Sequence, residues 1–139
     1  LKGFQDNSRN VFRYFAAGWN RDGLVLRAAG ELLEGTPERK RLLLLLTDAG
    51  PNDSHRIPPG GKYPFGHDYA DAPAVEDAAR EVRALQKRGI RVGAVFMGPS
   101  LNAPAAGTIY GKSLAHIRSM DQLATATGSL IRAEFRELE

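Results

Sequence analysis

Two short apolar runs along the chain predict the strands of a sheet. Residues 41–47 contain five consecutive leucines and stop abruptly at a cluster of turn-forming residues, 48–53. A run of this length without alternation is typical of a central strand buried on both faces, and the turn cluster argues against a helix. Residues 90–97 form a second apolar run, closed by Gly-Pro, and predict another buried strand. Residues 114–117 predict a third, shorter one.

Apolar residues at helical spacing predict four helices, over residues 8–17, 20–35, 73–88 and 120–138. The second of these begins at Asn20, a favourable N-cap. Strand, helix and strand between residues 41 and 97 form a right-handed crossover unit of a parallel sheet. The pattern therefore predicts an α/β fold, with a doubly wound, mostly parallel sheet flanked by helices.

Two segments without periodicity are expected to be loops. One is rich in Gly, Pro, His and Asp, follows residue 47 and is roughly twenty residues long, a length that is usually functional or mobile in a compact domain. The other covers residues 99–111. Trp19, directly before the second helix, is expected to pack against the edge of the sheet, because Trp is usually buried.

Composition narrows the range of functions. The chain has 139 residues, enough for a single domain, and no Cys, which excludes disulfides, zinc–thiolate sites and a cysteine nucleophile. No apolar run is long enough to cross a membrane, and no signal peptide opens the chain, so we expect a cytoplasmic protein. The net charge is +3, but the basic residues are dispersed and not interleaved with aromatic ones, which argues against nucleic-acid binding.

Asp48 is the first candidate for chemistry. Ligands of open parallel sheets bind beyond the carboxyl ends of the strands, and Asp48 follows the leucine strand directly. The alternative is a structural role, since Asp commonly stabilises a turn by hydrogen-bonding its own loop.

The order of features around Asp48 resembles a known family. Asn-Arg-Asp-Gly-Leu-Val-Leu-Arg at 20–27, a helix, Pro-Glu-Arg-Lys-Arg at 37–41, the leucine strand and Thr-Asp-Ala-Gly-Pro-Asn-Asp at 47–53 resemble the second half of a von Willebrand factor type A domain. Within that superfamily they are most similar to the bacterial branch containing the nitric oxide reductase activation proteins and the metal-binding-type subunit of cobaltochelatase. The resemblance covers most of residues 1–139 as one domain portion, but only the later part of the family's domain.

The resemblance implies a Rossmann-like fold with a metal-ion-dependent adhesion site. Such a site holds Mg²⁺ through an Asp-x-Ser-x-Ser loop after the first strand, a Thr or similar oxygen ligand, and an Asp after the fourth strand. Asp48 matches this last Asp, Asn20 falls where the Thr is expected, and Asp22 is an alternative to Asn20. Ala49 stands where the family commonly has Gly. No Asp-x-Ser-x-Ser occurs in the chain, so we expect the first strands to belong to another part of the polypeptide or to another copy.

The resemblance also implies a function. Mg²⁺ held by hydroxyl, amide and carboxylate oxygens keeps an open coordination position, which a carboxylate of a partner protein can fill. The chain is then a binding module and not an enzyme. By family resemblance its partner is an AAA+ ATPase of the MoxR class, and the pair activates or metallates another enzyme.

Two alternatives remain open. Residues 106–113, Ala-Gly-Thr-Ile-Tyr-Gly-Lys-Ser, differ by one residue from a phosphate-binding P-loop, so the chain could be a small phosphate or nucleotide hydrolase. A P-loop must follow a buried strand directly and open a helix, which is not the context expected here. The second alternative is a scaffold whose metal site has degenerated.

Overall fold

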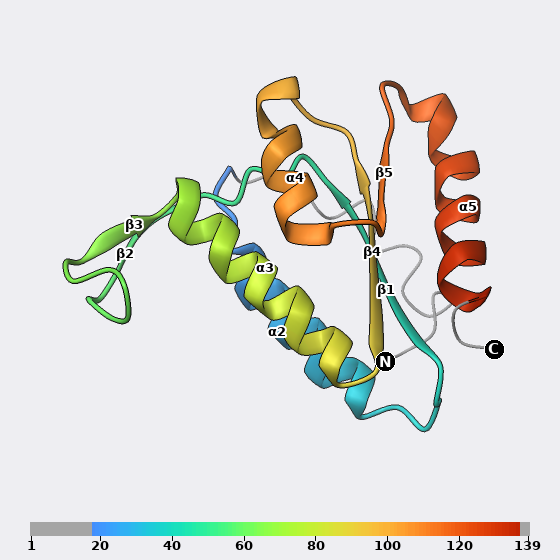
Figure 1. The fold of residues 1–139 in the computed structure, drawn as a ribbon, viewed down its shortest axis with the longest axis horizontal. Coiled ribbons are helices and arrows are strands. Elements are labelled where there is room, and N and C mark those ends of the chain that lie inside the picture. The colour runs from blue at the N-terminus through green and yellow to red at the C-terminus, as the bar shows by residue number, and fades with distance from the viewer. Residues whose placement is uncertain (1–17, 137–139) are drawn as a thin grey trace.

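Three parallel strands form the sheet of the computed structural model, which describes residues 18–136 (Figure 1). The strands β1 (Arg41–Thr47), β4 (Ile90–Phe96) and β5 (Leu114–His116) lie in the order β1-β4-β5. Their positions confirm the three predicted strands. With helices packed on the sheet, the chain is a mixed α/β fold.

Helices flank the sheet on both sides (Figure 1). The helices α3 (Asp71–Lys87) and α4 (Ala103–Tyr110) pack on one face and α5 (Leu123–Arg136) on the other, while α2 (Asp22–Glu34) packs along α3. Short 3₁₀ turns, Ser100–Asn102 and Met120–Gln122, lead into α4 and α5. None of the helices between residues 18 and 136 is both long and apolar enough to cross a bilayer. The helix predicted over residues 8–17 lies outside the described residues.

The core follows from the alternation of side chains along β4. Val92 and Ala94 face α3 and α4, whereas Val95 packs with Ile117 and Leu130 on the side of α5. All three β4 side chains are about 1% exposed or less. Burying a side chain of the size of Val contributes roughly 1.5–3 kcal/mol, so this central strand anchors both layers.

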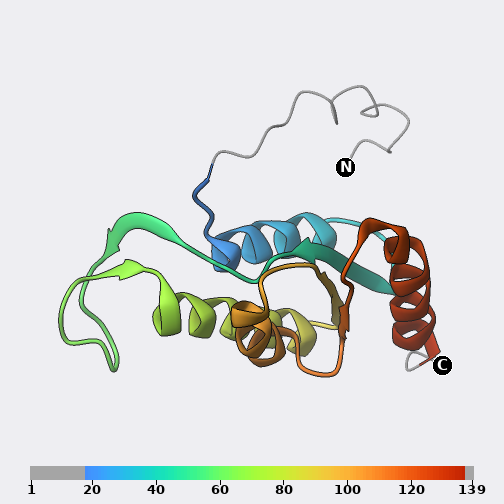
Figure 2. The same cartoon turned by 90° about the horizontal axis from the view of Figure 1, so that it is seen from above.

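The long loop after β1 contains a hairpin that the sequence does not reveal. β2 (Asp53–Ile57) and β3 (His67–Tyr69) pair antiparallel, with an irregular register, and the hairpin projects from the body of the molecule (Figures 1 and 2). β2 has the sequence Asp-Ser-His-Arg-Ile, which lacks apolar alternation. Its pairing comes from backbone hydrogen bonds, for which the side-chain pattern carries no signal.

The prediction of a loop over residues 99–111 is wrong, because α4 lies there. Pro104 and Gly107 suggest a break in the helix when only the sequence is read. Pro is tolerated in the first turn of a helix, where an N–H has no helical partner. Ala103 and Ala106 favour the helix, and burial of Ala106 against the sheet side of the molecule stabilises it.

β1 is less buried than the leucine run predicts. The prediction of burial on both faces is wrong for Leu46, which is 54% exposed. The reason is that, within residues 18–136, β1 pairs with β4 on one edge and with nothing on the other. Trp19 is 63% exposed, so the expectation that it packs against the sheet is also wrong within the described part of the chain.

Candidate metal site

Asp48 follows the carboxyl end of β1 and stabilises its own loop. One of its carboxylate oxygens accepts a hydrogen bond from the backbone N–H of Gly50 at 3.1 Å, and its carbonyl accepts one from the side-chain amide of Asn102 at 2.9 Å. A Cβ on Gly98 would lie 2.7 Å from the Asp48 carbonyl oxygen, so only glycine fits there. The turn-stabilising role considered for Asp48 is therefore present.

Asn20 and Asp22 reach this loop from the start of α2. The backbones of Asn20 and Asn52 exchange two hydrogen bonds, of 2.8 and 3.0 Å, which join the segment before α2 to the loop after β1. Asn20 is not the N-cap expected from the sequence, because α2 begins at Asp22 with Arg21 in the cap position. The side-chain amide of Asn20 instead donates to the carboxylate of Asp22.

The three candidate ligands line one cavity of about 370 Å³ beside the end of β1. Burial raises the pKa of the Asp22 carboxyl, the hydrogen bond from Asn20 lowers it, and the charge of Asp48 raises it. The negative charges of Asp22 and Asp48 therefore repel each other across the cavity. A cation between them would remove that repulsion. The cavity is completed by apolar and hydroxyl side chains: Val25, Leu45, Leu46 and Thr47.

Ala49 adopts a left-handed backbone conformation, which glycine adopts more easily than other residues. Its φ is +52°, and its side chain is 1% exposed, packed against Phe96 and Ala106. Left-handed backbone costs an L-residue roughly 1–2 kcal/mol. The residue next to Asp48 therefore carries backbone strain.

The donor set suits a hard cation. Two carboxylates and one amide supply oxygen atoms, which Mg²⁺ prefers, and the remaining positions of an octahedron would be filled by water or by a partner. The described residues contain no group of three or more His, Asp or Glu side chains that could hold a metal. The candidate set therefore has only two carboxylates, and the amide oxygen of Asn20 would be its third ligand.

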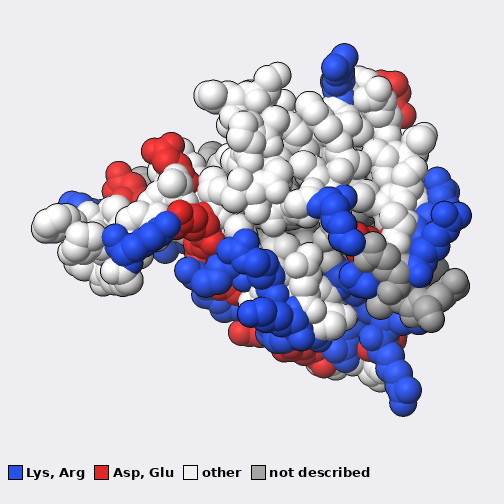
Figure 3. Space-filling view, in the orientation of Figure 1, with Lys and Arg blue, Asp and Glu red and all other residues white. Residues whose placement is uncertain are grey.

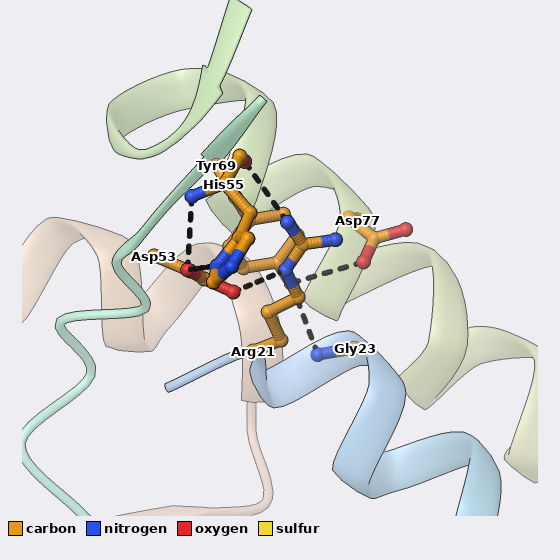
Figure 4. Close-up of polar contacts among 6 residues, drawn as sticks. All are labelled: Arg21, Gly23, Asp53, His55, Tyr69 and Asp77. Atoms are coloured by element: carbon orange, nitrogen blue, oxygen red, sulfur yellow. Dashed lines mark hydrogen bonds and ion pairs between the residues drawn. The ribbon is translucent and has the colours of Figure 1, made fainter. Parts of the chain in front are cut away.

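Arg21 fixes the start of α2 to the hairpin (Figure 4). Its Nε donates to Asp53 Oδ2 at 2.5 Å, its Nη2 donates to the carbonyl of His55 at 2.9 Å, and its guanidinium lies 5.3 Å from the ring centroid of Tyr69. The backbone N–H of His55, the His55 ring and Arg21 hold the pKa of the Asp53 carboxyl well below its usual range. Asp53 therefore stays ionised and bound to Arg21 at neutral pH.

Tyr69 ties the same region to α3. Its hydroxyl accepts a hydrogen bond from the backbone N–H of Gly23 at 3.0 Å and donates one to Asp77 at 2.9 Å (Figure 4). A Cβ at position 23 would lie 2.8 Å from Asp77 Cγ, so this approach requires glycine. Burial, and more weakly the neighbouring Asp77, raise the pKa of Tyr69, which keeps its proton and acts as the donor.

The P-loop-like segment 106–113 has the wrong geometry for phosphate binding of that kind. Residues 106–110 form the second half of α4, and the segment continues through Gly111 into β5. It therefore joins a helix to a strand, whereas a P-loop joins a strand to a helix. The fold gives no support to a hydrolase built on Lys112.

Charges on the face seen in Figure 3 are mixed, and the region over α4 carries none. Cations of α2 and of the hairpin form ion pairs with carboxylates of α3, as in Arg27–Glu81 and Lys62–Glu76. This pairing agrees with the dispersed charges of the sequence. Comparison of the chain with protein-family profiles, curated protein sequences and solved structures gave no match.

Sequence reasoning named Asn20, Asp22 and Asp48 but missed the residues that hold them. Arg21, Asp53 and Tyr69 are far apart in the sequence, and none belongs to a recognisable motif. Only one feature of the sequence could have indicated a role for Arg21. It lies between two candidate ligands, so its side chain is expected to face away from the metal site.

Proposed function

We propose that this chain is a divalent-metal-dependent protein-binding module, a portion of a von Willebrand factor type A domain whose Mg²⁺ is held in part by Asn20, Asp22 and Asp48. The observation that carries the proposal is that these three residues line one cavity although they come from two separate segments. Chance clustering is a weaker explanation, because the two segments are joined by the paired backbones of Asn20 and Asn52.

The open edge of β1 supports the assignment to this family. Met97 donates its backbone N–H to the carbonyl of Thr47, so alternate β1 residues, ending at Thr47, bond to β4. Leu42, Leu44 and Leu46 consequently direct their backbone groups to the edge that has no partner within residues 18–136. The first strand of a type A domain would pair here and bring its ligand loop to the cavity.

The exposed surface of α2 also supports an additional strand beside β1. Val25, Ala28 and Leu32 form an exposed apolar stripe at spacings of three and four, and Val25 shares the candidate cavity with Leu46. A strand added to β1 would lie beside this stripe and bury it.

The partner that fits such a site carries an acidic side chain. A Mg²⁺ ion with two carboxylates and neutral oxygens has a coordination position left for a carboxylate from outside. By family resemblance we propose an AAA+ ATPase of the MoxR class as this partner, acting in the cytoplasm on a third protein, an enzyme that is activated or metallated. The chain itself then binds and does not catalyse.

Binding of a purified MoxR-class ATPase to the immobilised chain, with Mg²⁺ or with EDTA, tests the proposal. Mg²⁺-dependent binding that Asp48→Asn abolishes would support it. Equal binding with EDTA would indicate a scaffold with a degenerate metal site. No binding under either condition would exclude this class of partner.

A further inference from the structure

We infer that Arg21 is a positioning residue of the candidate metal site, and that the β2–β3 hairpin acts through it to hold Asn20 and Asp22 in place. This inference rests on the proposed function for its metal-binding consequence. The structural coupling that it describes is independent of any metal.

Arg21 and its neighbours face opposite sides of the chain. Asn20 and Asp22 line the candidate metal cavity, whereas Arg21 lines a different cavity of about 510 Å³ between α2, α3 and the hairpin. Because one peptide unit separates Arg21 from each neighbour, an anchor on its side chain fixes both of them. The start of α2 is not held by a side-chain cap, because the N-cap residue Arg21 makes no capping hydrogen bond.

The anchor is made of several contacts with a defined direction. Arg21 donates through two of its nitrogens, to the carboxylate of Asp53 and to the backbone carbonyl of His55, both in β2. Asp53 is in turn held by the backbone N–H of His55 at 3.0 Å. Charge-assisted hydrogen bonds of a planar guanidinium are strong and orientation-specific, so a lysine can replace them only in part.

The anchor also lies next to the link between the two loops. Asn52, which exchanges backbone hydrogen bonds with Asn20, directly precedes Asp53, the ion-pair partner of Arg21. Asn52 and Asp53 are adjacent in one segment, and they bond to Asn20 and Arg21, which are adjacent in the other. Losing the side-chain contact should loosen the backbone contact beside it.

The structural alternative is that Arg21 merely stabilises the fold, and Arg27 provides the matched control. Arg27 lies further along α2, lines the same 510 Å³ cavity, and forms an ion pair of 2.7 Å with Glu81. Its hydrogen bond and its ion pair go to Glu81 in α3, and not to the hairpin or to the segment before α2. If Arg21 only stabilised the packing around this cavity, loss of either arginine would affect the fold alike.

The experiment compares Arg21→Ala, Arg21→Lys and Arg27→Ala with the unaltered chain in two measurements. Hydrogen–deuterium exchange without metal reports the N–H groups of Asn20 and Asn52, and calorimetric titration with Mg²⁺ alone reports affinity. We expect Arg21→Ala to accelerate both exchange rates by about tenfold and to weaken Mg²⁺ binding by about 10–100-fold, as loss of an outer-shell contact does. Arg21→Lys should show the same changes in lesser degree, and Arg27→Ala should show neither.

Unchanged exchange of the N–H groups of Asn20 and Asn52 in both Arg21 variants would overturn the inference, whatever the result of the Mg²⁺ titration. Equal acceleration by Arg27→Ala would also overturn it. If Arg21→Ala does not fold, Arg21→Lys decides. A chain that binds no Mg²⁺ but shows the exchange effect would contradict the proposed function and leave the coupling established.

Discussion

Asn20 and Asn52 are joined through their backbones alone, by two hydrogen bonds of 2.8 and 3.0 Å. Proline at position 52 removes one donor, whereas alanine preserves both bonds. We expect Asn52→Pro to destabilise the fold by roughly 1–3 kcal/mol and to weaken Mg²⁺ binding, and Asn52→Ala to leave stability within about 0.5 kcal/mol. Urea denaturation and Mg²⁺ titration of both variants check this. A similar loss in Asn52→Ala would mean that the side chain, and not the backbone, makes the connection.

The Tyr69 hydroxyl serves a buried donor and a carboxylate at once. Tyr69→Phe leaves the backbone N–H of Gly23 without its acceptor. Tyr69 is only 2% exposed, so this N–H group would stay unpaired in a buried region. We expect a loss of roughly 1–3 kcal/mol, the cost of an unsatisfied buried polar group. Tyr63→Phe removes a hydroxyl of the hairpin that is bonded to Glu76 of α3, and it should cost clearly less because water can replace that bond. Equal free energies of unfolding for the two variants would contradict this assignment.

Ala49 tests the strain beside Asp48. Ala49→Gly relieves roughly 1–2 kcal/mol of left-handed strain but loses a buried methyl worth about 0.8 kcal/mol and adds about 0.4–1 kcal/mol of unfolded-state entropy. The net change should lie within about 0.8 kcal/mol of zero. Ala49→Val should cost more than about 2 kcal/mol, because a branched side chain tolerates neither the positive φ nor the close packing. Chemical denaturation separates the two outcomes.

The ion pair of Asp53 predicts a pH dependence. Its folded-state pKa lies below the ordinary value of 3.8, so its stabilising effect is complete above that pH and is lost as the pH falls through the folded-state pKa. The difference in stability between the unaltered chain and Asp53→Asn should therefore be constant near neutrality and shrink in acid below pH 3.8. Thermal unfolding of both proteins over this range measures it. A stability difference that grows in acid would show that the pKa of Asp53 is not lowered in the folded state.

The sequence predicts the elements that depend on local patterns and fails where pairing is distant. The leucine run and the periodic residues of α3 identify β1 and α3, because burial of one face imposes a period on the sequence. The hairpin is not predictable, since β2 is polar and is held by contacts such as Arg21–Asp53. The exposure of Leu46 is likewise invisible, because it depends on what pairs with the other edge of β1.

In the candidate site, too, the sequence identifies single residues but not how they are arranged in space. Asp48 could be named from its place after a strand, and Asn20 and Asp22 from a family resemblance. That the three would line one cavity is a tertiary fact, produced by the Asn20–Asn52 bridge. The positive φ of Ala49 could be anticipated only from the glycine that is common at this position in the family that the sequence resembles.

Metal binding by Asp48 is the central claim, and Asp48→Asn separates it from the turn. Asparagine keeps an oxygen acceptor for the N–H of Gly50 and removes the charge, and Asp121→Asn changes an exposed carboxylate of the 3₁₀ turn before α5 as control. The most direct measurement is the melting temperature of the three proteins titrated with Mg²⁺. We expect a rise for the unaltered chain and for Asp121→Asn, and none for Asp48→Asn, whose metal-free melting temperature stays the same or increases. An equal rise in all three proteins, or none in any, would contradict it.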